Sequence, residues 1–285
     1  MKLLTYYRHS AIVLLFTIFS FYAHAAEKFR VCADPLNPPY STKAKDGFEN
    51  KIAELFAHEL NQELEYYWFP QRIGFIRNTL KSQIEDSDQY KCDVVMGLPA
   101  GFDFAKTTKP YYHSTYVLLI AQGRGWDDIT KASQLSNLSL QREESLKIAM
   151  FDRGPGTAWL QKQGLLDQGI PYQTMTGDNE NNVAMQIEKD LKATKIDMVI
   201  IWGPMAGYVV SQSPADSYRV IPMHSTPGMK FDFSMAMGIR YGDNKRKEQL
   251  ESLIDKNMGK IQSIISEYNV PLLAIPEQKN RNDDD

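Results

Sequence analysis

Short apolar runs with strand character alternate with helical patterns from residue 29 onward, and this alternation constrains the fold more than any other feature. The runs at 29–33, 64–69 and 93–97 are each bounded by Pro, Asp or Gly, as strands are. Apolar residues at helical spacing occupy the two intervals, over 52–60 and 73–80. A β-α-β-α-β series predicts a parallel sheet with right-handed crossovers, so the chain begins with an α/β unit.

A second series of the same type follows a strand at 117–121. Strands at 146–151 and 197–202 enclose helical patterns at 157–163 and 183–192. The sequence therefore predicts a second α/β unit.

Two extended crossings, near Ile120 and near Phe233, join these units, and a long amphipathic pattern from Asn244 to Tyr268 closes the fold. We expect an α/β fold with two lobes and a cleft between them. The expected parts are lobe 1 at 26–120 plus 232–276, lobe 2 at 121–231, and a disordered polar tail at 277–285.

The first 25 residues have the pattern of an export signal. Lys2 and Arg8 form a positive region, residues 11–22 are an apolar run, and Ala23-His24-Ala25 is the small-x-small pattern of a signal peptidase site. A run this short does not reach the roughly 20 residues that span a bilayer. We expect a Sec-type signal peptide cleaved after Ala25, a periplasmic protein, and a mature chain without a membrane span.

The charge balance argues against nucleic acid as a partner. The chain carries 32 Lys and Arg against 35 Asp and Glu, a net charge of −3. Cleavage after Ala25 removes two positive charges, Lys2 and Arg8, and no acid, which takes the net charge to −5. A nucleic-acid-binding domain would instead show a concentrated basic face.

Two cysteines, Cys32 and Cys92, remain in the mature chain. In an oxidising compartment such a pair usually forms a structural disulfide, and its number and spacing exclude a zinc site or a CxxC redox motif. The strands at 31–33 and 93–97 are neighbours in the expected sheet, so the two side chains come within reach. We favour a disulfide; a buried pair of free thiols is the alternative.

Ligands of open α/β sheets bind beyond the carboxyl ends of the strands. This rule assigns the segments 34–40, 98–102, 153–157 and 202–205 to the cleft. The binding candidates within them are Asp34, Asn37, Tyr40, Pro99, Gly101, Phe102, Gly154, Gly156, Thr157 and Trp202.

The segment 153–157 allows two interpretations. Its backbone N–H groups precede a helix, and with Thr157 as a cap they could hold an anion. An ordinary strand-to-helix turn that uses the conformational freedom of glycine is the interpretation we favour, because the motif is short and no phosphate-loop Lys follows it.

Aromatic residues are the second feature of the expected cleft. Tyr40, Phe102 and Trp202 would make a surface for a flat apolar ligand or an inserted loop of a partner protein. For Tyr112 we favour packing in the core.

Nothing in the sequence favours catalysis. Asp34 and Asp103 could act as an acid/base pair, but a loop Asp more often accepts hydrogen bonds from nearby N–H groups. His58, His113 and His224 all lie outside the expected cleft segments. The acidic residues at 283–285 lie on an expected flexible tail and make no preorganised metal site. We expect no catalytic residue, no metal site and no cofactor.

Four segments carry a family resemblance: Val31-Cys32-Ala33-Asp34-Pro35, Gly47-Phe48-Glu49-Asn50, Cys92-Asp93-Val94-Val95-Met96-Gly97 and Thr108-Lys109-Pro110-Tyr111-Tyr112. They resemble the type II periplasmic substrate-binding fold (solute-binding family 3), which includes the amino-acid receptors of ABC importers. The Cys-Ala-Asp-Pro start and residues 67–72 and 92–103 resemble its MoxJ/XoxJ branch. That branch is encoded beside quinoprotein methanol dehydrogenases, which use pyrroloquinoline quinone (PQQ), and their cytochrome c. The likeness covers about residues 29–273.

Two departures from the receptor pattern carry functional information. Amino-acid receptors of this fold commonly place an Arg after the strand equivalent to 93–97, where it binds the ligand carboxylate through two hydrogen bonds. Here residues 98–104 contain no Arg. The receptors also place an Asp for the ligand ammonium where this chain has Trp202. Without both partners, a desolvated zwitterion would lack the interactions that offset several kcal/mol per ion.

The resemblance and these departures together suggest an accessory protein that binds a PQQ-dependent methanol (alcohol) dehydrogenase and helps it mature. The cytochrome c is a second candidate partner, the enzyme's metal is calcium or a lanthanide, and the free protein is expected to be a monomer. The alternative is a solute receptor of an ABC importer for an uncharged or aromatic molecule. A dehydratase-like enzyme is the third and least favoured class.

Overall fold

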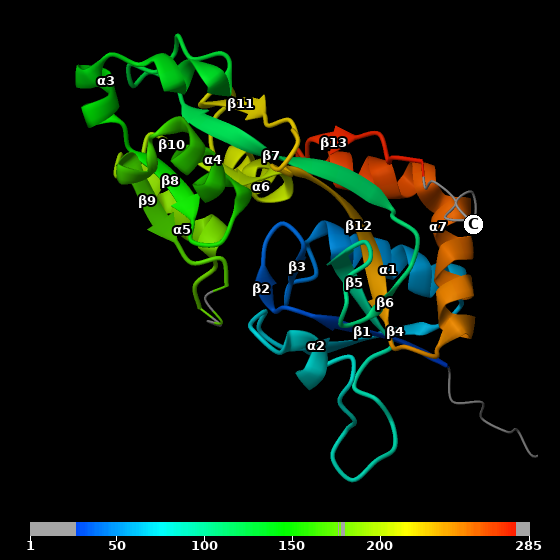
Figure 1. The fold of residues 1–285 in the computed structure, drawn as a ribbon. Helices are drawn as coiled ribbons and strands as arrows, with labels where there is room; N and C mark the ends of the chain where they lie inside the picture. Colours follow the sequence, from blue (N-terminus) through cyan, green and yellow to red (C-terminus); the bar gives the residue numbers. More distant parts are fainter. Residues whose placement is uncertain (1–26, 176, 178–179, 278–285) are drawn as a thin grey trace, which may run out of the picture.

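The computed structural model describes residues 27–175, 177 and 180–277 and shows two α/β lobes joined by long strands (Figure 1). The signal peptide predicted at 1–25 and all but one residue of the tail predicted at 277–285 lie outside the described residues. Within the described part of the chain, no helix is long and apolar enough to cross a membrane.

The first lobe is built on strands in the order β4-β1-β5-β12-β7. Strand β1 pairs in parallel with both β4 and β5, which confirms the sheet predicted from the β-α-β-α-β series. The bounds are β1 (Lys28–Ala33), β4 (Glu63–Trp68), β5 (Val94–Pro99), β7 (Tyr112–Ala121) and β12 (Asp232–Ile239), with the short strands β2 (Leu36–Asn37), β3 (Ser41–Thr42), β6 (Lys106–Thr107) and β13 (Leu272–Leu273).

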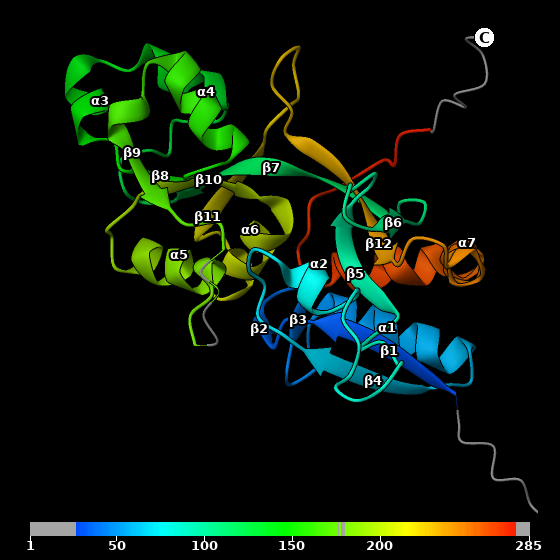
Figure 2. The same ribbon diagram turned by 60° about the horizontal axis from the view of Figure 1, so that its bottom comes forward.

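Two helices pack side by side in this lobe, α1 (Phe48–Glu59) and α7 (Asn244–Ser266) (Figures 1 and 2). Each presents an apolar stripe at helical spacing to one core, as the sequence predicts. The fully buried members include Ile52 and Phe56 from α1 and Ile254, Ile261 and Ile265 from α7. Burying one such side chain stabilises the fold by about 1.5–3 kcal/mol.

The second lobe continues from β7 through β10, β8 and β9, and β11 also pairs with β7. Its strands β10, β8 and β9 are parallel to one another. The bounds are β8 (Ile148–Phe151), β9 (Gly169–Tyr172), β10 (Met198–Trp202), β11 (Tyr218–Pro222), α3 (Leu140–Ser145), α4 (Pro155–Gln163), α5 (Val183–Lys192) and α6 (Gly203–Ser211), with 3₁₀ turns at Ala132–Asn137 and Leu166–Gln168.

Strand β7 belongs to both lobes. Its residues up to Thr115 pair with β12 and β13, whereas its residues from Tyr116 onward pair with β10 and β11. One continuous strand therefore changes partners between Thr115 and Tyr116. The lobe boundaries placed at residues 120 and 232 by the sequence remain a prediction.

The helix predicted over 73–80 is wrong in extent. Helix α2 covers only Phe75–Asn78. Gly74 precedes it with a φ of 88°, a left-handed conformation that stops a helix from extending backward, and Thr79 leaves the helical region at its end. Ile73 is consequently 89% exposed instead of lying in an apolar stripe.

The structure confirms the disulfide. The sulfurs of Cys32 and Cys92 are bonded, and their Cα atoms lie 5.4 Å apart. The bond joins the neighbouring strands β1 and β5 at the start of the latter, and both cysteines are buried. It closes a loop of 60 residues that contains α1, β4 and α2.

Because a cross-link of this span restricts the unfolded chain, replacing both cysteines (C32A/C92A) should lower the free energy of unfolding by about 4 kcal/mol. Urea unfolding measures the loss. Reductant should lower the stability of the wild type to that of the variant and leave the variant unchanged. If reductant leaves the unfolding free energy of the wild type unchanged, although the protein still unfolds completely in urea, the disulfide does not stabilise the fold.

Candidate functional site

A cavity of about 460 Å³ lies between the lobes. From the first lobe it is lined by the loop after β1, the start of α1, the end of β5 and the strand β12. From the second lobe it is lined by the segment before α5, the start of α6 and Tyr116 of β7. The end of β10 contributes Trp202.

Six of the ten residues assigned to the cleft from the sequence line this cavity: Asp34, Asn37, Tyr40, Pro99, Phe102 and Trp202. The Asp34 carboxylate accepts hydrogen bonds from the backbone N–H groups of Leu36 (2.7 Å) and Gln71 (2.5 Å). It therefore holds two loops together, as the capping interpretation predicts. Burial raises the pKa of Asp34, and the two N–H bonds oppose that shift.

The other four residues do not line the cavity. Gly101 is an exposed turn residue with a φ of 78°. Gly154, Gly156 and Thr157 lie where β8 leads into α4, and the assignment of 153–157 to the cleft is wrong for this cavity.

Packing explains why this loop is not available to a ligand. A Cβ on Gly156 would lie 2.9 Å from the side chain of Ile200, so the start of α4 rests directly on β10. The Thr157 hydroxyl donates to the carbonyl of Phe151 and caps no N–H group. The segment is an ordinary strand-to-helix turn, which was the favoured interpretation.

Other candidates are placed away from the cavity. Tyr112 is buried in the core, as predicted. Asp103 is exposed and does not line the cavity, so the structure does not bring it together with Asp34 as an acid/base pair. His113 is buried between β7 and β12, with its ring nitrogens 2.9 Å from Ser234 Oγ and 3.0 Å from Asp232 Oδ2. The described residues include no cluster of acids, cysteines and histidines able to hold a metal, and the acids at 283–285 lie outside them.

One wall of the cavity is aromatic. The Trp202 ring lies 5.4 Å from Tyr116 and 5.8 Å from Phe233, and Tyr116 lies 6.3 Å from Phe233, all measured between ring centroids. Only Trp202 of these three was expected in the site. The other two lie on the strands that connect the lobes, whose register the sequence does not show.

Glu49 says most about what the cavity could bind, although it was not among the candidates predicted from the sequence. It lies in the first turn of α1, and its carboxyl reaches Gly97 in β5, where an added Cβ would lie 2.1 Å from Oε1. Glu49 and Gly97 both line the cavity. The missing side chain at Gly97 leaves room for the carboxyl in this position.

No partner in the described part of the chain compensates for the burial of the Glu49 carboxyl. Its carboxyl has no hydrogen-bond or ion-pair partner among the described residues, and burial raises its pKa to about 8. No Lys, Arg or His is found among the described residues that line the cavity. A signal was present in the sequence: the amino ends of helices and the carboxyl ends of parallel strands share one edge, so a carboxyl in the first turn of α1 should face the cleft.

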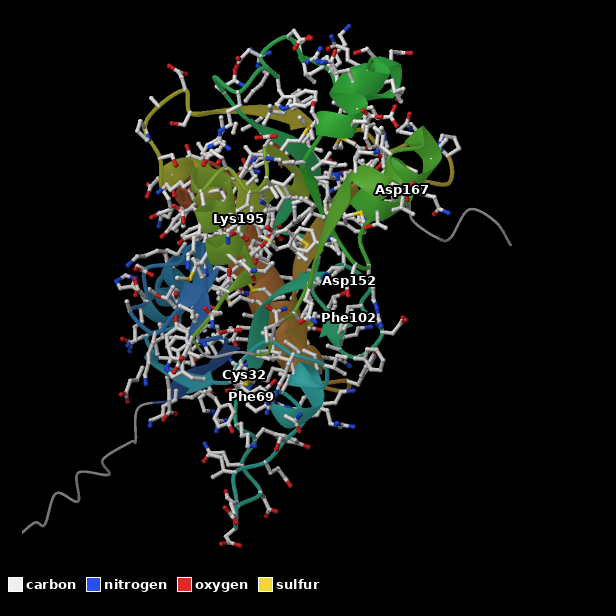
Figure 3. The ribbon with its side chains drawn as sticks, turned by 90° about the vertical axis from the view of Figure 1, so that its left-hand side faces the viewer. Cys32, Phe69, Phe102, Asp152, Asp167 and Lys195 are labelled. Carbon is white, nitrogen blue, oxygen red and sulfur yellow. A yellow bond between two sulfur atoms is a disulfide. The ribbon has the colours of Figure 1, made fainter. Side chains whose placement is uncertain are left out.

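The lobes touch across the cavity. Asn182 Nδ2 donates to Asn37 Oδ1 (3.1 Å) and to the carbonyl of Leu36 (3.3 Å), while its Oδ1 accepts from the N–H of Ala184 and caps α5. The Trp202 side chain hydrogen-bonds to the Tyr40 hydroxyl. In Figure 3, Phe102 belongs to the lower lobe and Asp152 to the upper lobe, on the side where the two meet.

Comparison with known proteins agrees with this architecture. No protein-family model matches the chain. The protein MoxJ of Methylorubrum extorquens is 28% identical over 263 residues, which cover 88% of this chain and 83% of MoxJ. The crystal structure of the periplasmic binding protein XoxJ from Methylobacterium extorquens AM1 has 32% identity and a TM-score of 0.68, covering 87% of this chain and all of XoxJ.

The chain belongs to the MoxJ/XoxJ group of periplasmic binding proteins. Its fold is the type II periplasmic binding fold, and the group places the protein in the periplasm. An ancestral cationic amino acid solute-binding protein shares the fold, with 17% identity and a TM-score of 0.63 over 85% of this chain and 95% of that one.

This member of the MoxJ/XoxJ group should lose stability between about pH 5 and pH 8 through Glu49. Burial raises the pKa of Glu49 to about 8 in the folded protein, while an unfolded Glu has a pKa of about 4.3. Between these values the folded state binds a proton that the unfolded state releases. Stability relative to Glu49→Gln should therefore fall with rising pH by up to about 1.4 kcal/mol per pH unit.

Urea unfolding of both proteins across this range is the measurement. Glu54→Gln is the matched control, because Glu54 lies on the same helix and pairs with Lys51 at the surface. Its stability should follow that of the wild type. A constant difference between the wild type and Glu49→Gln at every pH would show that Glu49 is ionised throughout.

Proposed function

We propose that the protein is a periplasmic accessory of a PQQ-dependent methanol dehydrogenase, which it binds and helps to reach its mature, active state. Two arguments support the association. The chain belongs to the MoxJ/XoxJ group, and the resemblance implies a gene encoded beside a methanol dehydrogenase. The observation that carries the proposal is the cavity itself. Trp202 stands where an amino-acid receptor has its acidic anchor, and the described lining has no Arg for a carboxylate.

The surface around the cavity fits protein recognition. Aromatic side chains dominate protein-binding hot spots because they bury a large area at little entropic cost. Tyr40, Phe102 and Trp202 are only partly buried, so their rings are accessible from the cleft. A loop or chain end of the dehydrogenase would dock there, with the cytochrome c as a second candidate partner and a free monomer as the unbound form.

A solute receptor of an ABC importer is the second candidate, because a cavity of about 460 Å³ is within the range of small-molecule sites. In that case a specific ligand should bind the isolated protein and draw the lobes together. Catalysis is not part of the proposal. The carboxylate of Asp34 is already occupied by two N–H groups, and Asp103 lies outside the cavity.

Native mass spectrometry of the tagged protein, gently purified from the periplasm of methanol-grown cells, should show a complex heavier by a dehydrogenase subunit. Replacing Phe102 by Ser removes an aromatic ring at the cleft and should reduce that complex several-fold. Leu140→Ser is the matched control, because Leu140 is 73% exposed on α3 in the second lobe and does not line the cavity. It should leave the complex intact.

A dehydrogenase that matures and works normally in cells lacking this protein would overturn the accessory role. A monomer that carries a stoichiometric small adduct and no dehydrogenase would favour the receptor instead.

We infer that export uses a Sec-type signal removed after Ala25. Amino-terminal sequencing of the mature protein should then begin at Ala26. A mature chain that retains residues 1–25 would contradict cleavage.

A further inference from the structure

The cavity combines three features that together select one class of ligand. A carboxyl without a partner, Glu49, faces it, the rings of Tyr116, Trp202 and Phe233 form a wall, and no basic side chain lines its described part. Carboxylates and aromatic faces both attract cations, and aromatic rings attract most strongly when water is excluded. The same features repel anions.

We propose that the cavity binds a small organic cation of the substituted-ammonium class, with Glu49 facing the positive charge and the aromatic wall covering the apolar groups. The inference concerns the isolated protein and is independent of the association with a dehydrogenase. It differs from the uncharged or aromatic ligand of the alternative receptor prediction, because the position of Glu49 became visible only in the structure.

The position of Glu49 suits this role. Its carboxyl projects from the first turn of α1 and lies against the bare backbone of Gly97, where an added Cβ would lie 2.1 Å from Oε1. The second carboxyl of the cavity, Asp34, is already satisfied by two N–H groups. Glu49 is therefore the group available to a ligand.

Protonation supplies a signature for this site. Burial raises the pKa of Glu49 to about 8, so near neutral pH the carboxyl is mostly protonated before a cation binds. A bound cation stabilises the ionised form, and binding releases a proton. Affinity for a permanent cation should rise roughly tenfold per pH unit below about pH 8 and level off above it.

The phenols that face Glu49 do not produce this signature. Burial raises the pKa values of Tyr40, Tyr111 and Tyr112 well above 10 and that of Tyr66 to about 12. They stay neutral where Glu49 titrates. Burial also raises the pKa of Asp34, the remaining acid of the cavity, while its two N–H bonds from Leu36 and Gln71 oppose that rise.

Choline and its uncharged carbon isostere, 3,3-dimethylbutan-1-ol, provide the test, because they differ in charge and little in shape. Isothermal titration calorimetry of the purified mature protein should show at least tenfold tighter binding of choline near pH 8. Titrations in two buffers of different ionisation enthalpy should show close to one proton released per choline near pH 7.

Glu49→Gln should remove both the preference for choline and the proton release, while Glu54→Gln should keep both. Circular dichroism checks that each variant is folded. Trp202→Leu should weaken choline binding several-fold and leave the proton release unchanged, which distinguishes the contribution of the aromatic wall from that of the Glu49 charge. Absence of choline binding, equal binding of the isostere, or an unchanged preference in folded Glu49→Gln would each overturn the proposal.

Discussion

The arrangement of the protein depends on β7, a single strand that pairs with two sheets. Its first part completes the sheet of the first lobe and its second part completes that of the second lobe, with the change between Thr115 and Tyr116. Backbone hydrogen bonds are continuous through this change, so the lobes cannot separate without breaking a sheet. The cavity forms at this junction, and Tyr116 of β7 and Phe233 of β12 line it.

The chemistry of the cavity follows from this position. Strand ends and helix starts of the two lobes line the cavity from its two sides. A carboxyl placed there is desolvated, which raises the pKa of Glu49. The rings of Tyr116, Trp202 and Phe233 in its wall tolerate desolvation and offer a broad surface. Binding, of a protein segment or of a cation, is consistent with such a site.

Much of the fold could be predicted because its elements repeat local patterns. Period-2 and period-3.6 apolar spacing marked β1, α1, α5 and α7, and the order of the elements implied parallel pairing and hence the nearness of Cys32 and Cys92. Local patterns failed where backbone conformation interrupts them. Gly74 in a left-handed conformation shortened α2, although the apolar spacing of residues 73–80 continues through it.

The site was predicted less completely than the fold. Residues that follow directly from the topology, such as Asp34 and Trp202, were found. The segment 153–157 also follows the carboxyl end of a strand, but Gly156 packs against Ile200, and this segment does not line the cavity. In its place, the stretch that leads into α5 reaches the first lobe through Asn182. No periodic pattern encodes this contact.

The order and type of the elements, the parallel sheets and the disulfide could be predicted from the sequence alone, because each depends on residue type at a known place along an element. Tertiary structure alone decided which loops meet across the cleft and that Glu49 lies against Gly97 without a partner. These depend on how the two lobes approach each other. Desolvation and distance are properties of that approach, so they become visible only when both lobes are in place.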